Sequence, residues 1–382
     1  MPEEAVVRTG ELLMQRLELA HRWYEGMVNP STEMLEYLYI PEADALVREK
    51  SPIRDIASVW DAEVLGDFLN RGELRPLIER SLRHYDSYLV ERDGYLILDA
   101  RRLEEPSSIA HSAFMILALL RAPPPRRTHQ IAALAAGILR QQRPDGSYKV
   151  CFEDLPDYGE ELYSGEAMLA LMETYRELRE ERYLHSVERG FSFYDAQYFG
   201  RGRVMEDTLV FFANWQSQAC RLLFESSRSA VLEQDVAKYL YRMHDQIIRQ
   251  DFYESVQRHP ARHVSVEVAC ALEGLNDAYA LVRASNDQRA ERYHACMCAG
   301  LAYLLGLQCT QNGTERERGG FGMSLDDRAQ RIDVTGHAAS AFIKSIQNDV
   351  ECCLRPEQYR RRSPGRLAME RARRSGYPRR NR

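Results

Sequence analysis

The chain alternates between two kinds of helical segment along most of its length. Apolar residues recur at intervals of three and four, the period of an α-helix, and strand-like alternation is scarce. In one kind, charges cover one face, as in LRPLIERSLRHYDSYLVE from Leu74. The other kind is nearly uncharged and rich in small and apolar residues, as in SSIAHSAFMILALL from Ser107. Because a helix that is apolar all round must be buried all round, the second kind is predicted to lie inside the first.

The segments form six pairs, each an outer helix followed by an inner helix. Outer helices are expected near residues 8–27, 74–91, 127–142, 181–198, 229–249 and 289–308, and inner helices near 55–70, 105–121, 162–178, 208–226, 263–283 and 333–349. A helical hairpin cannot bury both faces alone, so neighbours must stack in a row or close into a ring. The pattern predicts an all-α (α/α)6 toroid over residues 1–354. An open solenoid is the competitor, but the irregular repeats argue against it.

The connections between the helices also favour a ring. Those from an inner to an outer helix are mostly short, whereas those from an outer to an inner helix are long, at 28–54, 92–104, 143–161, 250–262 and 309–332. In a toroid the long connections emerge at one end, and long loops in a compact domain tend to carry function. The inner helices also point their positive dipole ends there, which favours an anionic group.

Composition and cysteine spacing indicate a soluble protein without cross-links. Apolar residues make up 45% of the chain and charged residues 28%. No apolar run approaches the roughly 18 residues of a membrane span, and the start MPEEAVVRTGELL lacks the apolar core of a signal peptide. A cytoplasmic location is therefore expected. None of the eight cysteines forms a CxxC pair, so neither disulfides nor structural zinc are expected.

The net charge of −6 conceals a basic tail at residues 355–382. This tail holds eleven arginines and two glutamates, a net of +9, which leaves −15 on the rest of the chain. Its few apolar residues predict a flexible, disordered appendage that solubilises the acidic body or docks onto it. The alternative is an arm for an acidic partner or an anionic membrane. No nucleic-acid-binding signature accompanies the arginines, so nucleic acid is not expected.

The helix ends that follow the long connections supply acids and aromatic rings. Those expected to hold a substrate are Asp145, Tyr148, Glu161, Asp207, Trp215, Phe321 and Arg331. Carboxylates can bond sugar hydroxyls, and aromatic rings can stack on sugar faces, so the set suits a small-molecule or oligosaccharide substrate. Trp215, in the apolar run FFANWQSQA, also fits a packing role inside the ring.

Glu166, in YSGEAMLAL, is the first candidate for catalysis. Its helix neighbours are small or apolar, and a carboxyl group held among them retains its proton, as a general acid requires. Glu267 occupies a similar place in HVSVEVACALE, and Tyr163 lies one turn before Glu166. Two such carboxyl groups facing each other across a hole would form an acid–base pair. The alternative is that both glutamates stabilise helix N-termini, with Ser164 as the cap before Glu166.

Asp333 and His337, in RIDVTGHAASAF, are the second candidate. They are four residues apart and share one helix face, where an Asp–His pair can act as a general base or supply two metal ligands. A histidine on an apolar helix is otherwise a hydrogen-bonded core residue. No HExxH, GxSxG, GxGxxG or GxxxxGK[ST] motif occurs in the chain. The sequence therefore predicts neither a metal nor a cofactor.

Three stretches resemble known toroid families. GILRQQRPDGSY is similar to the QxxxGxW junction of terpene cyclases, with Gln141 or Gln142, Gly146, and Tyr148 in place of the tryptophan. GGFGMSLDDRAQRIDVTGH resembles the zinc-binding end of protein prenyltransferase β subunits, but it is one residue longer and lacks a clear counterpart of their Asp-x-Cys pair. YSGEAMLAL is similar to sugar-active toroids, which include unsaturated glucuronyl hydrolases, glucuronyl epimerases and polysaccharide lyases.

These resemblances imply a toroid with its site in the central hole. We expect a carbohydrate-processing enzyme of hydrolase, lyase or epimerase type, with Glu166 as acid/base and Asp333 and His337 assisting. An isoprenoid cyclase or prenyltransferase is the alternative enzyme, but the DxDD motif of the cyclases is absent and the rim is rich in acids. A third interpretation is a non-catalytic binding toroid that partners another enzyme, and a hole plugged by side chains would identify it.

Overall fold

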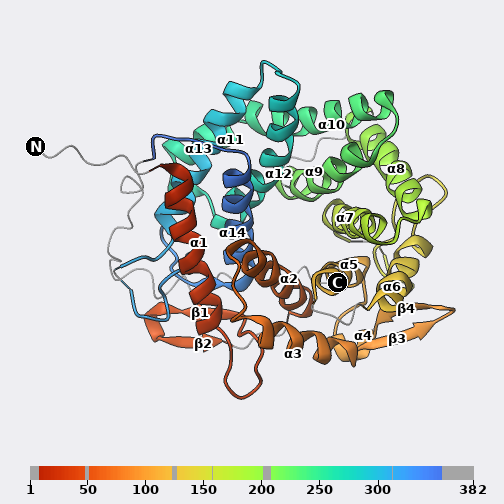
Figure 1. Cartoon of the computed structure of the whole chain (residues 1–382), viewed down its shortest axis with the longest axis horizontal. Helices are drawn as coiled ribbons and strands as arrows, with labels where there is room; N and C mark the ends of the chain where they lie inside the picture. Colours follow the sequence, from red (N-terminus) through yellow and green to blue (C-terminus); the bar gives the residue numbers. More distant parts are fainter. Residues whose placement is uncertain are drawn as a thin grey trace, which may run out of the picture.

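The computed structural model describes residues 8–47, 51–122, 127–156, 158–200, 208–311 and 313–354. In these ranges an inner ring of helices lies inside an outer ring (Figure 1). The inner ring consists of α2 (Pro52–Leu69), α5 (Ile109–Arg121), α7 (Glu160–Leu178), α9 (Leu209–Ser226), α12 (Ser265–Ala284) and α14 (Ile332–Gln347). The outer ring consists of α1 (Thr9–Gly26), α3 (Arg75–Asp86), α6 (Thr128–Arg140), α8 (Glu181–Asp195), α10 (Ala230–Arg249) and α13 (Ala290–Leu307).

The inner ring is closed. Each inner helix packs against the next one along the chain, and α14 returns to pack against α2. The chain is therefore an (α/α)6 toroid, as the alternation of charged and uncharged segments predicts, and not an open solenoid. The inner helices are buried on nearly all sides: in α5 every residue from Ile109 to Leu119 is buried. The outer helices keep a charged face in water.

The long connections lie at the N-terminal ends of the inner helices, where they carry small elements of their own. These are β1 (Leu38–Ile40), η1 (Pro41–Ala43), β2 (Ala45–Val47), β3 (Leu89–Arg92), β4 (Tyr95–Leu98), α4 (Ala100–Leu103), η2 (Ala196–Gly200), α11 (Phe252–Arg258), η3 (Pro260–Arg262) and β5 (Gln330–Arg331). Antiparallel pairing of β1 with both β2 and β5 joins the first and last long connections. The outer helix expected at 74–91 ends at Asp86 instead, because β3 pairs with β4 in a hairpin.

The junction that resembles QxxxGxW ties two outer helices together. Gln142 Nε2 donates to the carbonyl oxygens of Gly146 and Ser186, at 3.1 and 2.8 Å, and so links the end of α6 to α8. Gly146 has a φ of +99°, and a Cβ there would overlap the Arg189 carbonyl, so only glycine fits. Tyr148 is completely buried, and its hydroxyl bonds Ser186 Oγ at 2.8 Å.

The same arrangement recurs where α13 meets α1 and the outer ring closes. Gln308 Nε2 donates to the carbonyl oxygens of Gly319 and Arg16, at 2.9 and 2.8 Å. Gly319 has a φ of +102°, close to that of its counterpart. Phe321 follows two residues later and is completely buried, as Tyr148 is. The structure therefore places both aromatic residues in packing roles at the junctions, although the sequence predicted them at the substrate.

One cysteine prediction is wrong, because Cys298 and Cys352 form a disulfide. The two residues are 54 positions apart, and the bond joins α13 to the segment after α14, so no short spacing marks the pair. Cys220 and Cys270 are free thiols, and both are buried, as Cys151 is. None of the described helices is long and apolar enough to cross a membrane. The basic tail at 355–382 lies outside the described residues.

Candidate functional site

Glu166 lies inside the inner ring, nearly two turns into α7. The helix begins at Glu160 after Gly159, so the predicted cap at Ser164 is wrong, and Ser164 lies within the helix. Glu166 is 5% exposed, and its Oε2 has no hydrogen-bond partner among the described residues. Burial raises the pKa of its carboxyl group to about 8, although His337 and Arg54 act in the opposite direction.

Asp61, on α2, is a second carboxyl group in the same place. A Cβ at position 336 would overlap its carboxylate, so Gly336 allows Asp61 to lie directly against α14. Burial raises the pKa of Asp61 to about 8, the nearby Glu273 adds to the rise, and His337 opposes it. Because the charge of His337 acts on both Asp61 and Glu166, the imidazole lies close to both carboxyl groups.

His337 is bound to a buried carboxylate. Its Nδ1 lies 2.6 Å from Glu273 Oε2, and Asn214 Nδ2 donates to the same oxygen at 3.2 Å. The side chain of Glu273 is 3% exposed and that of His337 is 17% exposed, so the imidazole is the more accessible member of the pair. Burial disfavours the imidazolium, but Cys270 and Glu273 favour it more strongly, so the pKa of His337 is raised well above its ordinary value.

Aromatic rings lie beside this acid–base group. The Trp215 ring lies 5.7 Å from the His337 ring, 6.5 Å from Trp60 and 5.5 Å from Phe114, measured between centroids. Trp60 also lines a cavity of about 410 Å³ at the C-terminal ends of α5 and α7. Trp60, Phe114 and Trp215 therefore form an aromatic cluster next to His337, in which Phe114 and Trp215 are buried.

Asp333 and Arg331 form an ion pair at the start of α14. Arg331 Nε and a terminal nitrogen donate to the two carboxylate oxygens at 2.8 and 2.6 Å, and Arg54 Nε from α2 adds a bond at 3.2 Å. Burial alone would raise the pKa of Asp333, but the two arginines lower it below its ordinary value. Asp333 is therefore an ionised, cation-bound carboxylate, in contrast to Asp61 and Glu166.

Tyr163 lies on the same helix as Glu166 and packs against the half-exposed Tyr158, with ring centroids 6.1 Å apart. Burial and the nearby Glu166 raise the pKa of its hydroxyl, so it remains a neutral hydrogen-bonding group. Of the predicted residues, Trp215, Tyr163 and His337 lie near Glu166. The Asp333–Arg331 pair is linked to them through Arg54, which bonds Asp333 and whose charge acts on Glu166.

Glu267 contacts the long connection that precedes α12. Its Oε2 lies 3.4 Å from His263 Nδ1, and His263 Nε2 lies 2.8 Å from Ser255 Oγ on α11. α11 belongs to a long connection and packs against the outer helix α13. The structure therefore places Glu267 in a hydrogen-bonded contact between α12 and this connection.

The remaining predicted substrate residues are Asp145, Glu161 and Asp207. Asp145 is exposed and accepts hydrogen bonds from the backbone N–H and hydroxyl of Ser147, which stabilise its turn and lower its pKa. Glu161 is half-buried in the first turn of α7. Asp207 lies outside the described residues.

Three groups of side chains in the described ranges have donor atoms close enough to hold a metal ion. They are Cys270 with Glu273 and His337, His294 with Cys298 and Cys352, and His21 with Glu25 and Glu73. Within each group the donor atoms lie within 4.8 Å of one another. In the first group the Glu273–His337 hydrogen bond already compensates the buried carboxylate, so the ion pair is complete without a metal.

Sequence reasoning missed Asp61, Trp60 and Glu273. It considered the helix ends next to long connections, whereas these residues lie near the middle of α2 and α12. A charged residue inside an otherwise apolar stretch was the available signal, as in SVWDAEV and ACALEGL. Buried carboxyl groups at such positions are unusual enough to mark candidate functional residues.

The fold resembles that of several carbohydrate-active proteins. The structure superposes on a D-mannose isomerase with a TM-score of 0.64 at 10% identity, covering 88% of this chain and 97% of that one. A sugar epimerase from a ruminal bacterium gives 0.62 at 14% identity, with 88% and 98% covered. An unsaturated glucuronyl hydrolase specific for heparin gives 0.60 at 9%, with 88% and 97% covered. At such identities the likeness establishes the fold alone.

No protein-family model matches the sequence, and no characterised protein matches it either.

Proposed function

We propose that the protein is a carbohydrate-processing enzyme whose reaction takes place among Glu166, Asp61 and His337 in the central hole. The observation that carries this proposal is the convergence of the buried Glu166, the half-buried Asp61 and a carboxylate-bound imidazole beside the Trp215 ring. A sugar offers hydroxyl groups to the acids and an apolar face to the ring. The shared fold with a mannose isomerase, a sugar epimerase and a glucuronyl hydrolase supports the same class.

The charge distribution favours proton transfer over attack by a carboxylate. Glu166 and Asp61, with pKa values of about 8, keep a proton at pH 7 and are still able to release it. The ionised carboxylates Asp333 and Glu273 are each bound to a cationic side chain. A displacement mechanism needs an ionised carboxylate that is free to attack the sugar. Isomerisation or epimerisation, in which a carbon next to a carbonyl loses and regains a proton, instead needs groups that exchange protons near neutral pH, and pKa values of about 8 suit this role.

Each residue then has a distinct role. One of the two carboxyl groups, Asp61 or Glu166, accepts the proton of the substrate carbon as a carboxylate, and the other returns a proton. His337 donates a hydrogen bond to the carbonyl oxygen through Nε2, because Glu273 holds Nδ1. Tyr163 binds substrate hydroxyls from the same helix as Glu166. The acid-lined hole argues against an isoprenoid substrate, which requires an apolar cavity.

Proton exchange with solvent tests this proposal directly. The full-length protein is incubated in D2O with a panel of aldoses, ketoses, uronic acids and disaccharides, and NMR monitors deuterium at the carbon next to the carbonyl. We expect incorporation with at least one sugar, and at least a 100-fold loss of rate in Glu166→Gln, the size of effect typical of a general acid or base.

Glu63→Gln is the matched control. Glu63 is also 5% exposed and lies on α2, and burial raises its pKa to about 9, but its charged neighbours are Arg121 and Asp67. Its substitution should leave the exchange rate unchanged. The proposal is rejected if the folded wild-type protein neither exchanges nor hydrolyses any sugar of the panel and shows no thermal shift with any of them.

A further inference from the structure

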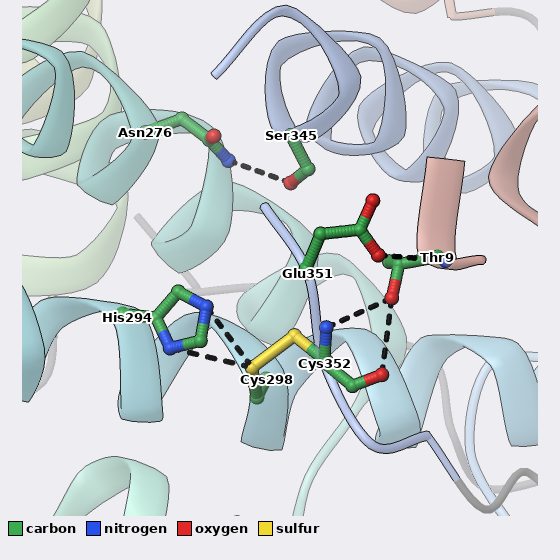
Figure 2. Close-up of a disulfide and its surroundings, with 7 residues drawn as sticks. All are labelled: Thr9, Asn276, His294, Cys298, Ser345, Glu351 and Cys352. Carbon is green, nitrogen blue, oxygen red and sulfur yellow. Dashed lines mark hydrogen bonds between the residues drawn. A yellow bond between two sulfur atoms is a disulfide. The ribbon is translucent and has the colours of Figure 1, made fainter. Parts of the chain in front are cut away.

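The disulfide lies where the first and last described parts of the chain meet. Figure 2 shows Cys298 on the same helix as His294, bonded to Cys352 in the segment that follows α14, with Thr9 beside it. Thr9 Oγ1 donates to the Cys352 carbonyl at 3.1 Å and accepts from its N–H at 2.8 Å, and the Thr9 N–H donates to Glu351 Oε2 at 3.1 Å. We call this contact between residues 349–354, α1 and α13 the seam.

The surroundings of the bond differ from those of the buried cysteines. Cys298 and Cys352 are both partly exposed, whereas Cys151, Cys220 and Cys270 are completely buried. A disulfide that solvent can reach is open to attack by an external thiolate, and a buried one is protected. The Cys298–Cys352 bond is therefore accessible to redox chemistry in the folded protein.

A histidine and a third thiol accompany the bond. Both ring nitrogens of His294 lie 3.9 Å from Cys298 Sγ, one helical turn away. An imidazolium at this distance stabilises a thiolate and can supply its proton. Cys353, the residue after Cys352, is exposed and free. A cross-link that serves only stability requires neither group.

We propose that the Cys298–Cys352 disulfide is a reversible redox latch that holds the segment at residues 349–354 against α1 and α13. The inference rests on the seam alone and does not depend on the proposed carbohydrate chemistry.

The chemistry of opening is thiol–disulfide exchange. A small thiol, as its thiolate, attacks Cys352 Sγ, the S–S bond breaks, and Cys298 leaves as a thiolate that takes a proton from His294. A second small thiol attacks the resulting mixed disulfide and releases Cys352. Two electrons thus pass from two small thiols to the protein disulfide, which yields two cysteine thiols and one small disulfide.

Opening removes the covalent restraint on the segment. Residues 349–354 contain no helix or strand, and the bonds from Thr9 then hold Cys352 in place. The segment follows directly from α14, the helix that carries Asp333 and His337. The redox state of the surroundings therefore determines whether the segment that follows α14 is covalently held.

The test uses the full-length protein in dithiothreitol redox buffers. Alkylation and mass spectrometry report the state of Cys298 and Cys352, and limited proteolysis reports cleavage within residues 349–354. We expect reduction without global unfolding, at least tenfold faster cleavage of the segment, and a Tm about 5 °C lower. Cys298→Ser should be cleaved rapidly in every buffer, whereas Cys353→Ser should behave like the wild type.

His294 provides an independent measurement. We expect His294→Ala to slow reduction by dithiothreitol several-fold while the Tm of the oxidised protein stays unchanged, since the imidazole acts on the leaving thiolate. The latch is rejected if Cys298 and Cys352 stay unpaired in oxidising buffer, if the bond resists reduction until the protein unfolds, or if cleavage of the segment is the same in both states. Protection of both thiols by added Zn²⁺ in oxidising buffer would also reject it, in favour of a metal site.

Discussion

Burial and hydrogen bonding set opposite protonation states for carboxyl groups in the same hole. Glu166 has an oxygen without a hydrogen-bond partner among the described residues, so burial raises its pKa to about 8. Asp333 is also buried, but its bonds to Arg331 and Arg54 hold its pKa below the ordinary value. Residues of one chemical kind thus become a proton donor and a permanent anion, because their neighbours differ.

Stability should fall with rising pH because of Glu166. Its folded pKa of about 8 exceeds the ordinary 4.5, so the folded state binds the proton more tightly. Its contribution is complete below pH ~4.5, declines from there to pH ~8, and amounts to a few kcal/mol. Glu166→Gln, which cannot ionise, should therefore show a shallower loss of Tm between pH 5 and pH 8.

Glu63→Gln should flatten the same curve, since burial raises the pKa of Glu63 to about 9. Differential scanning calorimetry across this pH range provides the measurement. Parallel curves for the wild type and both variants would show that these carboxyl groups ionise normally in the folded protein.

The Glu273–His337 pair predicts a partial rescue. His337→Asn leaves the carboxylate of Glu273 buried without its cation, which we expect to cost roughly 3–5 kcal/mol of unfolding free energy. The double variant His337→Asn/Glu273→Gln removes that charge and should recover much of the stability, measured by denaturant unfolding. Activity should remain lost in both. Recovery of activity in the double variant would exclude His337 as the hydrogen-bond donor to the substrate carbonyl.

Two junctions between outer helices share one construction. In each, a glutamine at the end of an outer helix bonds a glycine carbonyl and the backbone of the next outer helix, and a buried aromatic residue follows. Gly146 and Gly319 both have a φ near +100°. The sequence stretch that resembles the QxxxGxW repeat therefore marks a junction between neighbouring outer helices. Its aromatic residue packs inside that junction.

Gly319→Ala should destabilise the protein strongly. The substitution imposes a positive φ on alanine, and its Cβ would also overlap the Leu19 carbonyl. Gly94→Ala is the control, because Gly94 has a φ of +80° with nothing within 4 Å of a Cβ. We expect a loss of about 1 kcal/mol for Gly94→Ala and at least 2 kcal/mol more for Gly319→Ala, measured by urea unfolding. Equal losses of stability in the two variants would show that α1 can shift away from the added Cβ at little energetic cost.

At the scale of the whole molecule, closure of the inner ring of helices brings the site residues together. Asp61, Glu166, Glu273 and His337 come from four inner helices, and they meet only because α14 returns to α2. The seam between α1, α13 and residues 349–354 lies at this closure. Contacts near the two ends of the described chain therefore lie directly after α14, the helix that carries His337.

Thr9→Val should loosen the seam in a manner that depends on the disulfide. Its hydroxyl makes two hydrogen bonds to Cys352, and their loss should speed cleavage within residues 349–354 about fivefold in reduced protein. In oxidised protein the disulfide holds the segment, so the effect should be small. Thr174→Val, which removes a buried hydroxyl bonded only within α7, is the control. An equal effect in both redox states would contradict this account of the seam.

The sequence predicted the inner and outer rings of helices better than it predicted the junctions between them and the site residues. Outer and inner helices could be told apart because charges mark the face in water and their absence marks burial. The expected inner helix at 208–226 begins at Leu209 and ends at Ser226. The aromatic Tyr148 and Phe321 could not be assigned, because a buried ring at a junction and an exposed ring at a substrate have the same sequence signal.

The sequence by itself determined the alternation of helices, the placing of long connections at one end, and Glu166 and His337 as residues of interest. All of these follow from local periodicity and from polar residues within apolar helices. Only the tertiary structure decided that Asp61 and Glu273 join them, that Glu267 contacts His263, and that Cys298 pairs with Cys352. These are contacts between residues distant in the chain, and periodicity carries no information about which distant residues meet.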